Sequence, residues 1–186
     1  MVHPLRVFLV GALLFCGSAT AVLAQVSAAE LPARARAMGL TLALPSLEDL
    51  RFDTTVRRLH RSDFHLHWRH RGPGFEIYAT LVPEAAGASP MFPNVLGGAA
   101  VTNVAVNAPE EEHFVALYRA GDDDLERLNA DWAAFWAFTP QPGLSGRDYG
   151  YQATYYKEGR GLVHLYVFAD DRAVVNGDWA YVLPFE

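Results

Sequence analysis

The clearest pattern along the chain is an alternation of apolar and polar side chains on both sides of a turn that contains two glycines. The stretches "DFHLHWR" and "FEIYATL" each place apolar residues at every second position. This period is typical of a β-strand with one buried face. A short loop between the two strands places Trp68 opposite Ile77 in the core and leaves Tyr78 on the other face. The pattern predicts a β-hairpin with one apolar and one polar face.

A second hairpin is indicated near the C-terminus. Two stretches rich in β-branched and aromatic residues, 149–156 and 162–168, lie on either side of a turn signal at Glu158-Gly159. The second stretch is apolar on both faces, which is typical of a strand in the middle of a sheet.

Helices are expected before and between the hairpins. One is expected to open at Ser46, whose hydroxyl can cap it. The stretch 95–121 predicts one or two more, the second beginning at Pro109 and ending at Gly121. A short helix with an acidic first turn then precedes a buried strand or turn in "WAAFWAF". This order predicts an α+β fold, in which an antiparallel sheet is built from two β-hairpins with helices packed on one face.

The first residues have the composition of a secretory signal peptide. One positive charge at Arg6 precedes a short apolar run, and small residues lead to Ala24, where cleavage is expected. The sequence thus predicts a signal peptide over 1–24, an N-terminal segment over 25–45 that is partly disordered or helical, and a single α+β domain over 46–186. The mature protein is expected to be exported, to the periplasm or outside the cell.

The charge and the cysteine content of the chain limit which classes of binding partner are expected. Acidic residues outnumber basic ones by 21 to 15, and the formal net charge of −6 argues against binding to nucleic acid or to an anionic membrane. Cys16 is the only cysteine and lies in the predicted signal peptide, so the mature chain is expected to hold no disulfide. No other stretch approaches transmembrane length. The remaining partners are a small molecule, a glycan or a protein.

Histidines cluster in and just before the first hairpin, and this cluster has metal-ligand chemistry. His65 and His67 are spaced to lie on one face of a strand, a geometry that suits zinc or copper, and His70 is a candidate third ligand. The alternative is that these side chains coat the polar face of the hairpin, half-solvated beside Arg69 and Tyr78. We favour the alternative, because two imidazoles alone do not make a metal site.

Aromatic residues crowd the last third of the chain. Tyr149, Tyr151 and Tyr155 lie on one face of a predicted strand, where they would form a stacking platform for a sugar or a peptide. The alternative is an aromatic core, since the neighbouring strand is apolar on both faces and must be covered by something. We favour the core.

Catalytic motifs do not stand out. No serine stands in a G-x-S-x-G turn, and no glycine-rich phosphate loop is present. The preferred prediction is an exported, non-catalytic domain that binds a ligand or a partner. The first alternative is a divalent-metal-binding protein that uses the hairpin histidines. The second is a hydrolase with dispersed carboxylates, since the fold and not sequence spacing sets their partners.

Overall fold

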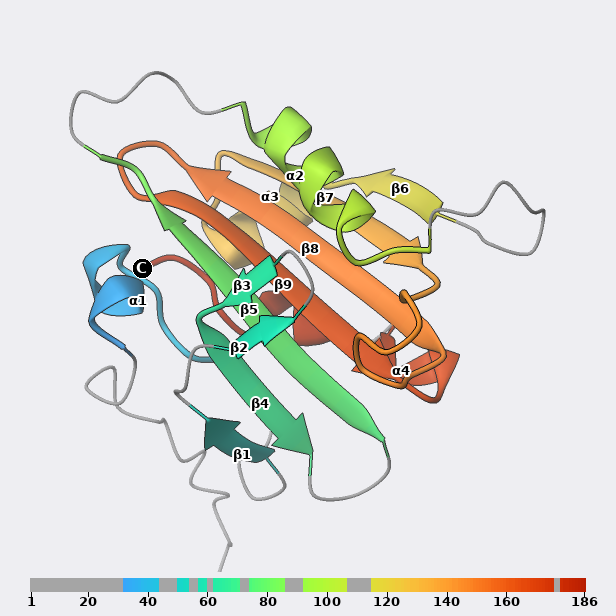
Figure 1. The fold of residues 1–186 in the computed structure, drawn as a ribbon. Coiled ribbons are helices and arrows are strands. Elements are labelled where there is room, and N and C mark those ends of the chain that lie inside the picture. Colours follow the sequence, from blue (N-terminus) through green and yellow to red (C-terminus); the bar gives the residue numbers. More distant parts are fainter. Residues whose placement is uncertain are drawn as a thin grey trace, which may run out of the picture.

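The structure is a computed structural model that describes residues 32–43, 50–53, 57–59, 62–70, 74–85, 92–106, 115–175 and 178–186. The predicted signal peptide lies outside these residues. The elements in chain order are α1 (Ala33–Ala37), β1 (Leu50–Asp53), β2 (Arg57–Leu59), β3 (Ser62–Phe64), β4 (Leu66–His70), β5 (Phe75–Pro83), α2 (Pro93–Thr102), β6 (Val115–Arg119), α3 (Asp122–Leu128), β7 (Trp132–Phe138), β8 (Tyr149–Lys157), β9 (Gly161–Ala169), α4 (Arg172–Val175) and the 3-10 helix η2 (Asp178–Tyr181) (Figure 1). None of the helices in the described ranges is long and apolar enough to cross a membrane.

One antiparallel sheet organises the fold, with seven strands in the order β1-β4-β5-β9-β8-β7-β6 and a separate two-stranded pair, β2-β3. Both predicted hairpins are confirmed. In the first, Trp68 pairs with Ile77 as expected, and in the second β8 pairs with β9 along the whole length of both strands. The strand predicted to be central, β9, lies between β5 and β8, and all of its residues are buried. The α+β class predicted from the sequence is therefore confirmed.

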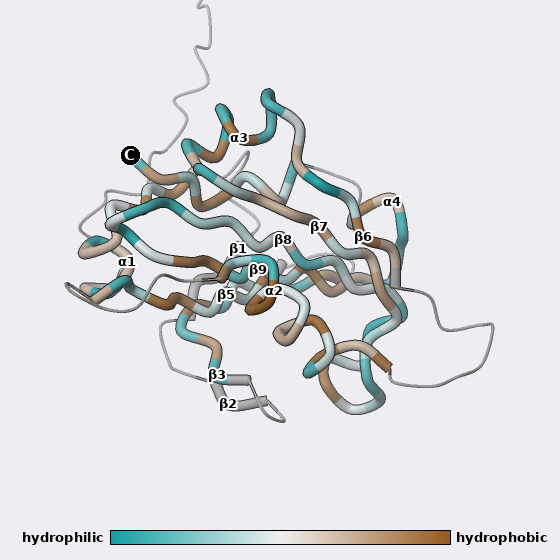
Figure 2. The backbone as a smooth tube through the Cα atoms, turned by 90° about the horizontal axis from the view of Figure 1, so that it is seen from above, coloured by the Kyte–Doolittle hydropathy of each residue, from teal (hydrophilic) through white to brown (hydrophobic). Residues whose placement is uncertain are grey.

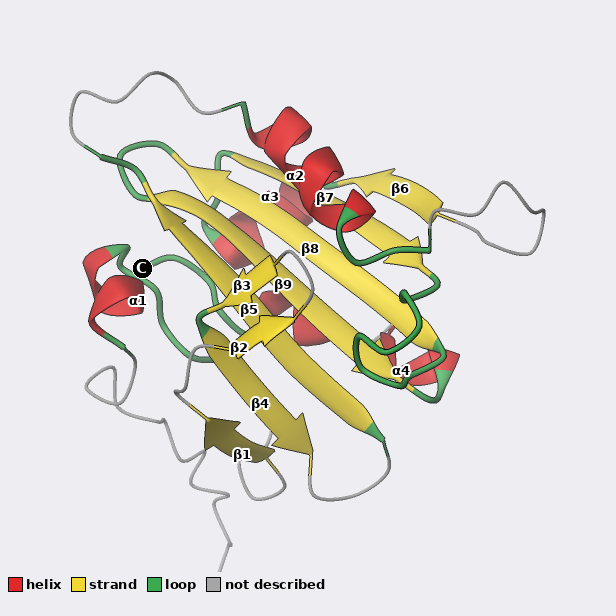
Figure 3. Cartoon of the chain, in the orientation of Figure 1, coloured by secondary structure: helices red, strands yellow, loops and turns green. Residues whose placement is uncertain are grey.

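The two faces of the sheet are covered by different elements (Figures 2 and 3). One face, here called the C-terminal face, packs against α1, α3 and the last residues of the chain, from Ala180 to Phe185. The other, here called the α2 face, packs against α2. The helices therefore lie on both faces, and not on one face as predicted from the sequence, because each face presents apolar side chains that must be buried.

A close approach of α2 to the sheet fixes the position of the helix. A Cβ atom at Gly97 would lie 2.5 Å from Cη2 of Trp136, so only a glycine allows this ring to rest against the helix. Beside it, Nε2 of Gln152 donates a hydrogen bond to the carbonyl oxygen of Gly97 at 3.0 Å. The helix is thus held by an indole ring from β7 and by an amide from β8.

In the first hairpin, the face that the sequence predicts to be polar is buried. His67, Glu76 and Tyr78 keep 3%, 6% and 1% of their surface exposed. The ring of Phe64 lies 4.9 Å from that of Tyr78, and the Tyr78 hydroxyl donates to Glu76 at 2.7 Å. The prediction of half-solvated histidines on this face is therefore wrong at His67, whereas His65 is half-buried. An alternating pattern tells which residues share a face, but what covers that face is decided by distant parts of the chain.

A β-bulge separates β3 from β4. The backbone N–H of His65 donates to the carbonyl oxygen of Ala79 at 2.8 Å, although Leu66 is the register partner of Ala79. His65 and Leu66 thus both lie opposite Ala79. The extra residue shifts the alternation of side chains, so that residues before and after it point to opposite faces of the sheet. Phe64 consequently packs on the α2 face, whereas Leu66 packs on the C-terminal face.

Two segments that the sequence predicts to be helical form strands in the parts that the structure describes. Leu50–Asp53 forms β1 and pairs with β4, in place of a helix from Ser46. Val115–Arg119 forms β6 and pairs with β7, in place of a helix that ends at Gly121. In both cases the open edge of the sheet supplies hydrogen-bond partners that outweigh the weak local preference for a helix. The helical alternative for the N-terminal segment is confirmed at Ala33–Ala37.

The contact of Gly97 with Trp136 can be tested with two neighbouring glycines. Gly97→Ala should lower the free energy of unfolding by about 1–3 kcal/mol, since the new methyl group must displace a packed indole ring. A Cβ atom at Gly98 would have no neighbouring atom within 4 Å. Gly98→Ala should therefore be neutral or stabilise by up to about 1 kcal/mol through helix propensity. Urea titration of both variants measures the difference, and equal effects would contradict the packing described.

Candidate functional site

A row of mostly polar residues crosses the α2 face of the sheet. Strand register makes each member the direct neighbour of the next. In order from β5 to β6, the row consists of Thr80, His164, Thr154, Ala134 and Arg119. The helix α2 lies across this row and leaves a hollow on each side. The two hollows are the candidate binding sites of the described structure.

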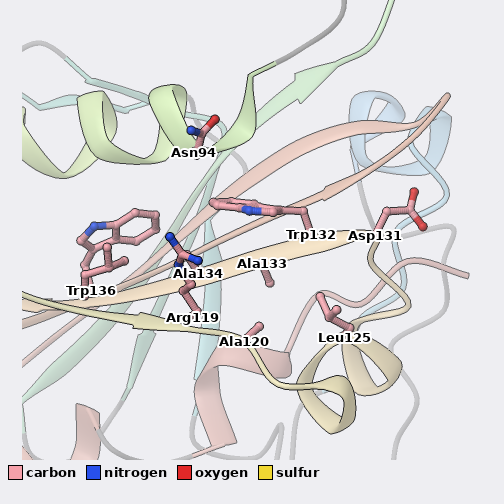
Figure 4. Close-up of a pocket in the computed structure, with 10 residues that line it drawn as sticks. Asn94, Arg119, Ala120, Leu125, Asp131, Trp132, Ala133, Ala134 and Trp136 are labelled. Carbon is pink, nitrogen blue, oxygen red and sulfur yellow. The ribbon is translucent and has the colours of Figure 1, made fainter.

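The larger hollow, here called the tryptophan cavity, has a volume of about 580 Å³ (Figure 4). It opens where α2 faces β6 and β7 and continues past the end of β6 toward α3, since Ala120, Leu125 and Ala133 also line it. Its walls include Trp132 and Trp136 on β7, Arg119 and Leu117 on β6, and Asn94 on α2. This volume is in the range of sites that hold small molecules.

The cavity exists because a small residue lies between two large ones. Trp132, Ala134 and Trp136 occupy alternate positions of β7, so their side chains share one face. The methyl group of Ala134 cannot fill the space between the two indoles. Trp136 is 5% exposed and forms a fixed wall against α2, whereas Trp132 is only partly buried. Trp132 therefore offers more of its surface to a ligand.

Arg119 supplies the positive charge of the cavity. It is the register partner of Ala134, and its guanidinium lies between the two indoles in Figure 4. Within the described ranges, no side chain forms a hydrogen bond or an ion pair with it. The carboxylate at one end of the cavity, Asp131, accepts a hydrogen bond from the backbone N–H of Glu158 at 2.7 Å. Arg119 is thus an exposed cation beside apolar walls.

A buried chain of hydrogen bonds runs beneath α2 from Gln152 to His164. Nε2 of Gln152 donates to the hydroxyl of Thr154 at 2.8 Å, and the Thr154 oxygen lies 2.9 Å from Nδ1 of His164. All three side chains are buried. Burial lowers the pKa of His164 to about 4, because the charged imidazolium would be removed from water. His164 is therefore neutral around pH 7.

The predicted metal ligands do not converge in the described structure. Nδ1 of His65 accepts a hydrogen bond from the backbone N–H of Leu81 at 2.9 Å, and its Nε2 contacts the guanidinium of Arg34. Burial and this guanidinium lower the pKa of His65. His67 instead stacks on Tyr78, with ring centroids 4.2 Å apart. Among described residues, no three His, Cys, Asp or Glu side chains could hold one ion.

The side chain of His70 lies outside the described residues. Zinc or copper binding through His65, His67 and His70 therefore stays a prediction. Because both ring nitrogens of His65 are engaged, that site would require these contacts to break.

The three tyrosines of the predicted platform share a face of β8, but they do not form an open surface. Tyr155 is 0% exposed, and its hydroxyl donates to the carbonyl oxygen of Leu183 at 2.7 Å. Tyr151 lies against Phe135 and is partly buried, and Tyr149 is 39% exposed. The C-terminal residues cover this part of the sheet, so a ligand cannot reach all three rings. The core interpretation is confirmed for Tyr155.

Neither Arg119 nor Trp132 is predicted from the sequence as a site residue. The sequence "WAAFW" contains an indication of the cavity. At the two-residue period of a strand, the small residue Ala134 lies between Trp132 and Trp136. Arg119 could not be added to this pattern, because β6 was predicted as part of a helix. Comparison with known protein families, with curated proteins and with solved structures finds no match to this chain. The candidate site therefore rests on its own geometry.

The low pKa of His164 predicts a pH dependence of stability. Between pH 6.5 and about 4 the unfolded chain binds a proton at this residue and the folded chain does not, so stability falls as the pH falls. The free energy of unfolding should fall by about 2 kcal/mol between pH 7 and pH 4.5 through this residue. Urea titrations of the wild type and of His164→Gln measure it as a difference between the two proteins. Parallel pH profiles would show that His164 is not buried as a neutral group.

Proposed function

We propose that the protein is an exported, non-catalytic binding protein whose ligand occupies the tryptophan cavity. The proposed ligand is a small amphipathic anion, with a flat or ring-shaped apolar body and one carboxylate or similar group. The single observation that carries this proposal is the place of the Arg119 guanidinium between two indole rings in a cavity of about 580 Å³.

The apolar part of the ligand is inferred from the walls. Trp132 and Leu117 both present apolar surface, and Leu117 is 57% exposed. Indole faces favour stacking with flat rings and with the C–H faces of sugars. A ligand that covers Trp132 and Leu117 would remove this surface from water, which stabilises the complex.

The charge of the ligand is inferred from Arg119. The chain has a net charge of −6, yet this arginine stands in the cavity with no carboxylate partner in the described structure. A guanidinium binds a planar carboxylate through two parallel hydrogen bonds, and low-dielectric walls strengthen the attraction. An anionic group on the ligand would therefore supply the counter-charge that the protein does not.

The chemistry of the lining supports binding without catalysis. Its titratable side chains are Arg119 and Asp131. Arginine keeps its proton at any physiological pH, so it cannot serve as a general base. Each hollow contains one described carboxylate, Asp131 in the tryptophan cavity and Asp63 in the other. The paired carboxylates that glycoside hydrolysis needs are not assembled in either.

Export is part of the proposal on sequence grounds. The support is the charged, apolar and small-residue order of 1–24, which is the order of a cleaved signal. N-terminal sequencing of the exported protein should give Gln25 as the first residue. Retention of 1–24 would contradict this part of the proposal.

The binding proposal can be tested by calorimetry with 2-naphthoate, a flat anion, and with its neutral amide. Naphthoate should bind the wild type, and Arg119→Gln should weaken it about 10- to 100-fold, since a hydrogen bond to a charged group is worth about 1.5–3 kcal/mol. The amide should bind more weakly than naphthoate to the wild type and about equally to both proteins.

Two further variants separate the cavity from the general surface charge. Ala134→Leu fills the space between the indoles and should abolish binding while Arg119 stays in place. Arg172→Gln removes an exposed arginine of α4, outside the cavity, and should leave the affinity unchanged. Naphthoate binding that survives both Arg119→Gln and Ala134→Leu would refute the assignment of the site.

A further inference from the structure

The second hollow lies on the other side of α2 and has a volume of about 340 Å³. The elements around it are α2, β3, β5 and β9, together with the bulge residue between β3 and β4. Its polar lining consists of Asp63, His65, Thr80, Asn103, His164 and Tyr166. We call it the histidine cavity. Unlike the tryptophan cavity, it contains a largely buried polar side chain from the centre of the sheet.

That side chain is His164, which is 6% exposed and lines the cavity. Its Nδ1 is turned toward the Thr154 oxygen at 2.9 Å. The other ring nitrogen, Nε2, makes no hydrogen bond within the described ranges of the chain. A nine-tenths buried imidazole thus presents one unused nitrogen to a hollow that is open to small molecules.

The hydrogen-bond chain beneath α2 favours one of the two ring nitrogens of His164 as the position of its proton. Gln152 has one donor group, its amide nitrogen, and uses it toward both Gly97 and Thr154. Thr154 accepts from Gln152, so its own proton is free to be donated to Nδ1 of His164. An imidazole that accepts at Nδ1 and is neutral carries its proton at Nε2. The cavity therefore contains an N–H donor.

A second donor lies beside it on the same strand. Tyr166 lines the cavity, and burial raises its pKa, so its hydroxyl keeps the proton. This hydroxyl has no hydrogen-bond partner in the described part of the protein. The rings of His164 and Tyr166 lie 6.4 Å apart. Two neutral donors thus face one small space.

We infer that the histidine cavity is a second binding site, which takes a small neutral molecule through a carbonyl oxygen held by Nε2–H of His164. The hydroxyl of Tyr166 is the second donor to the same molecule. A neutral carbonyl fits better than a carboxylate, because both donors are uncharged and none of the described residues that line the hollow is an arginine or a lysine. The proton on Nε2 makes this nitrogen a donor and leaves no lone pair there for a metal ion.

The test uses benzamide, a neutral primary amide, and benzoate, its charged analogue of the same shape. Nitrogen-15 NMR of the purified protein first reports the tautomer of His164, and the Nε2–H form is expected. Benzamide should then shift the Nε2–H resonance of His164 in a saturable manner. Its affinity for the histidine cavity, followed on the resonances of Tyr166, should fall at least about tenfold in His164→Phe and remain unchanged in Arg172→Gln, a substitution outside both cavities.

Thr154→Val serves as the second variant, because it removes the hydroxyl with little change in shape. It should release the Nδ1 contact and weaken benzamide binding even if His164→Phe does not fold. Benzoate should bind more weakly than benzamide at His164. An Nδ1–H tautomer in the wild type, or benzamide shifts confined to Trp132 and Trp136, would overturn the inference. Neither result depends on whether naphthoate binds the tryptophan cavity.

Discussion

The contact between α2 and the sheet at Gly97 is the interaction on which the α2 face depends. Without a side chain at this position, the ring of Trp136 comes within reach of the helix, and Gln152 donates to the helix backbone. A larger residue would push the helix away and expose the polar row beneath it. Buried polar groups are stable only when they are hydrogen-bonded, and α2 both covers the chain from Gln152 to His164 and supplies one of its acceptors.

Both cavities follow from this placement. A single helix cannot cover a face of so many strands, so it leaves space on either side, toward β6 and toward β5. The residues at these two margins differ in chemistry. Arg119 and Trp132 make one margin cationic and aromatic, whereas His164 and Tyr166 make the other neutral and rich in donors. The same row of the sheet thus ends in two hollows with different linings.

The sequence predicted the parts of the fold that depend on local pattern. The register of Trp68 with Ile77 and the central position of β9 follow from alternation and from a run apolar on both faces. Properties that depend on distant contacts were not predictable. The burial of His67 requires the aromatic packing around Tyr78, and the strand at Val115–Arg119 exists because β7 offers an edge. The tryptophan cavity depends on both local pattern and distant contacts. Trp132 and Trp136 share a face of one strand, whereas Arg119 lies beside them only because β6 pairs with β7.

The most direct test of the α2 placement is the proximity of Gly97 to Trp136, measured as a nuclear Overhauser effect between the Gly97 Hα protons and Hη2 of the Trp136 ring. A strong cross-peak is expected, since a Cβ at Gly97 would lie 2.5 Å from Cη2 of Trp136. Absence of that cross-peak, with both resonances assigned and sharp, would contradict the placement of α2 and with it the two cavities beside the helix.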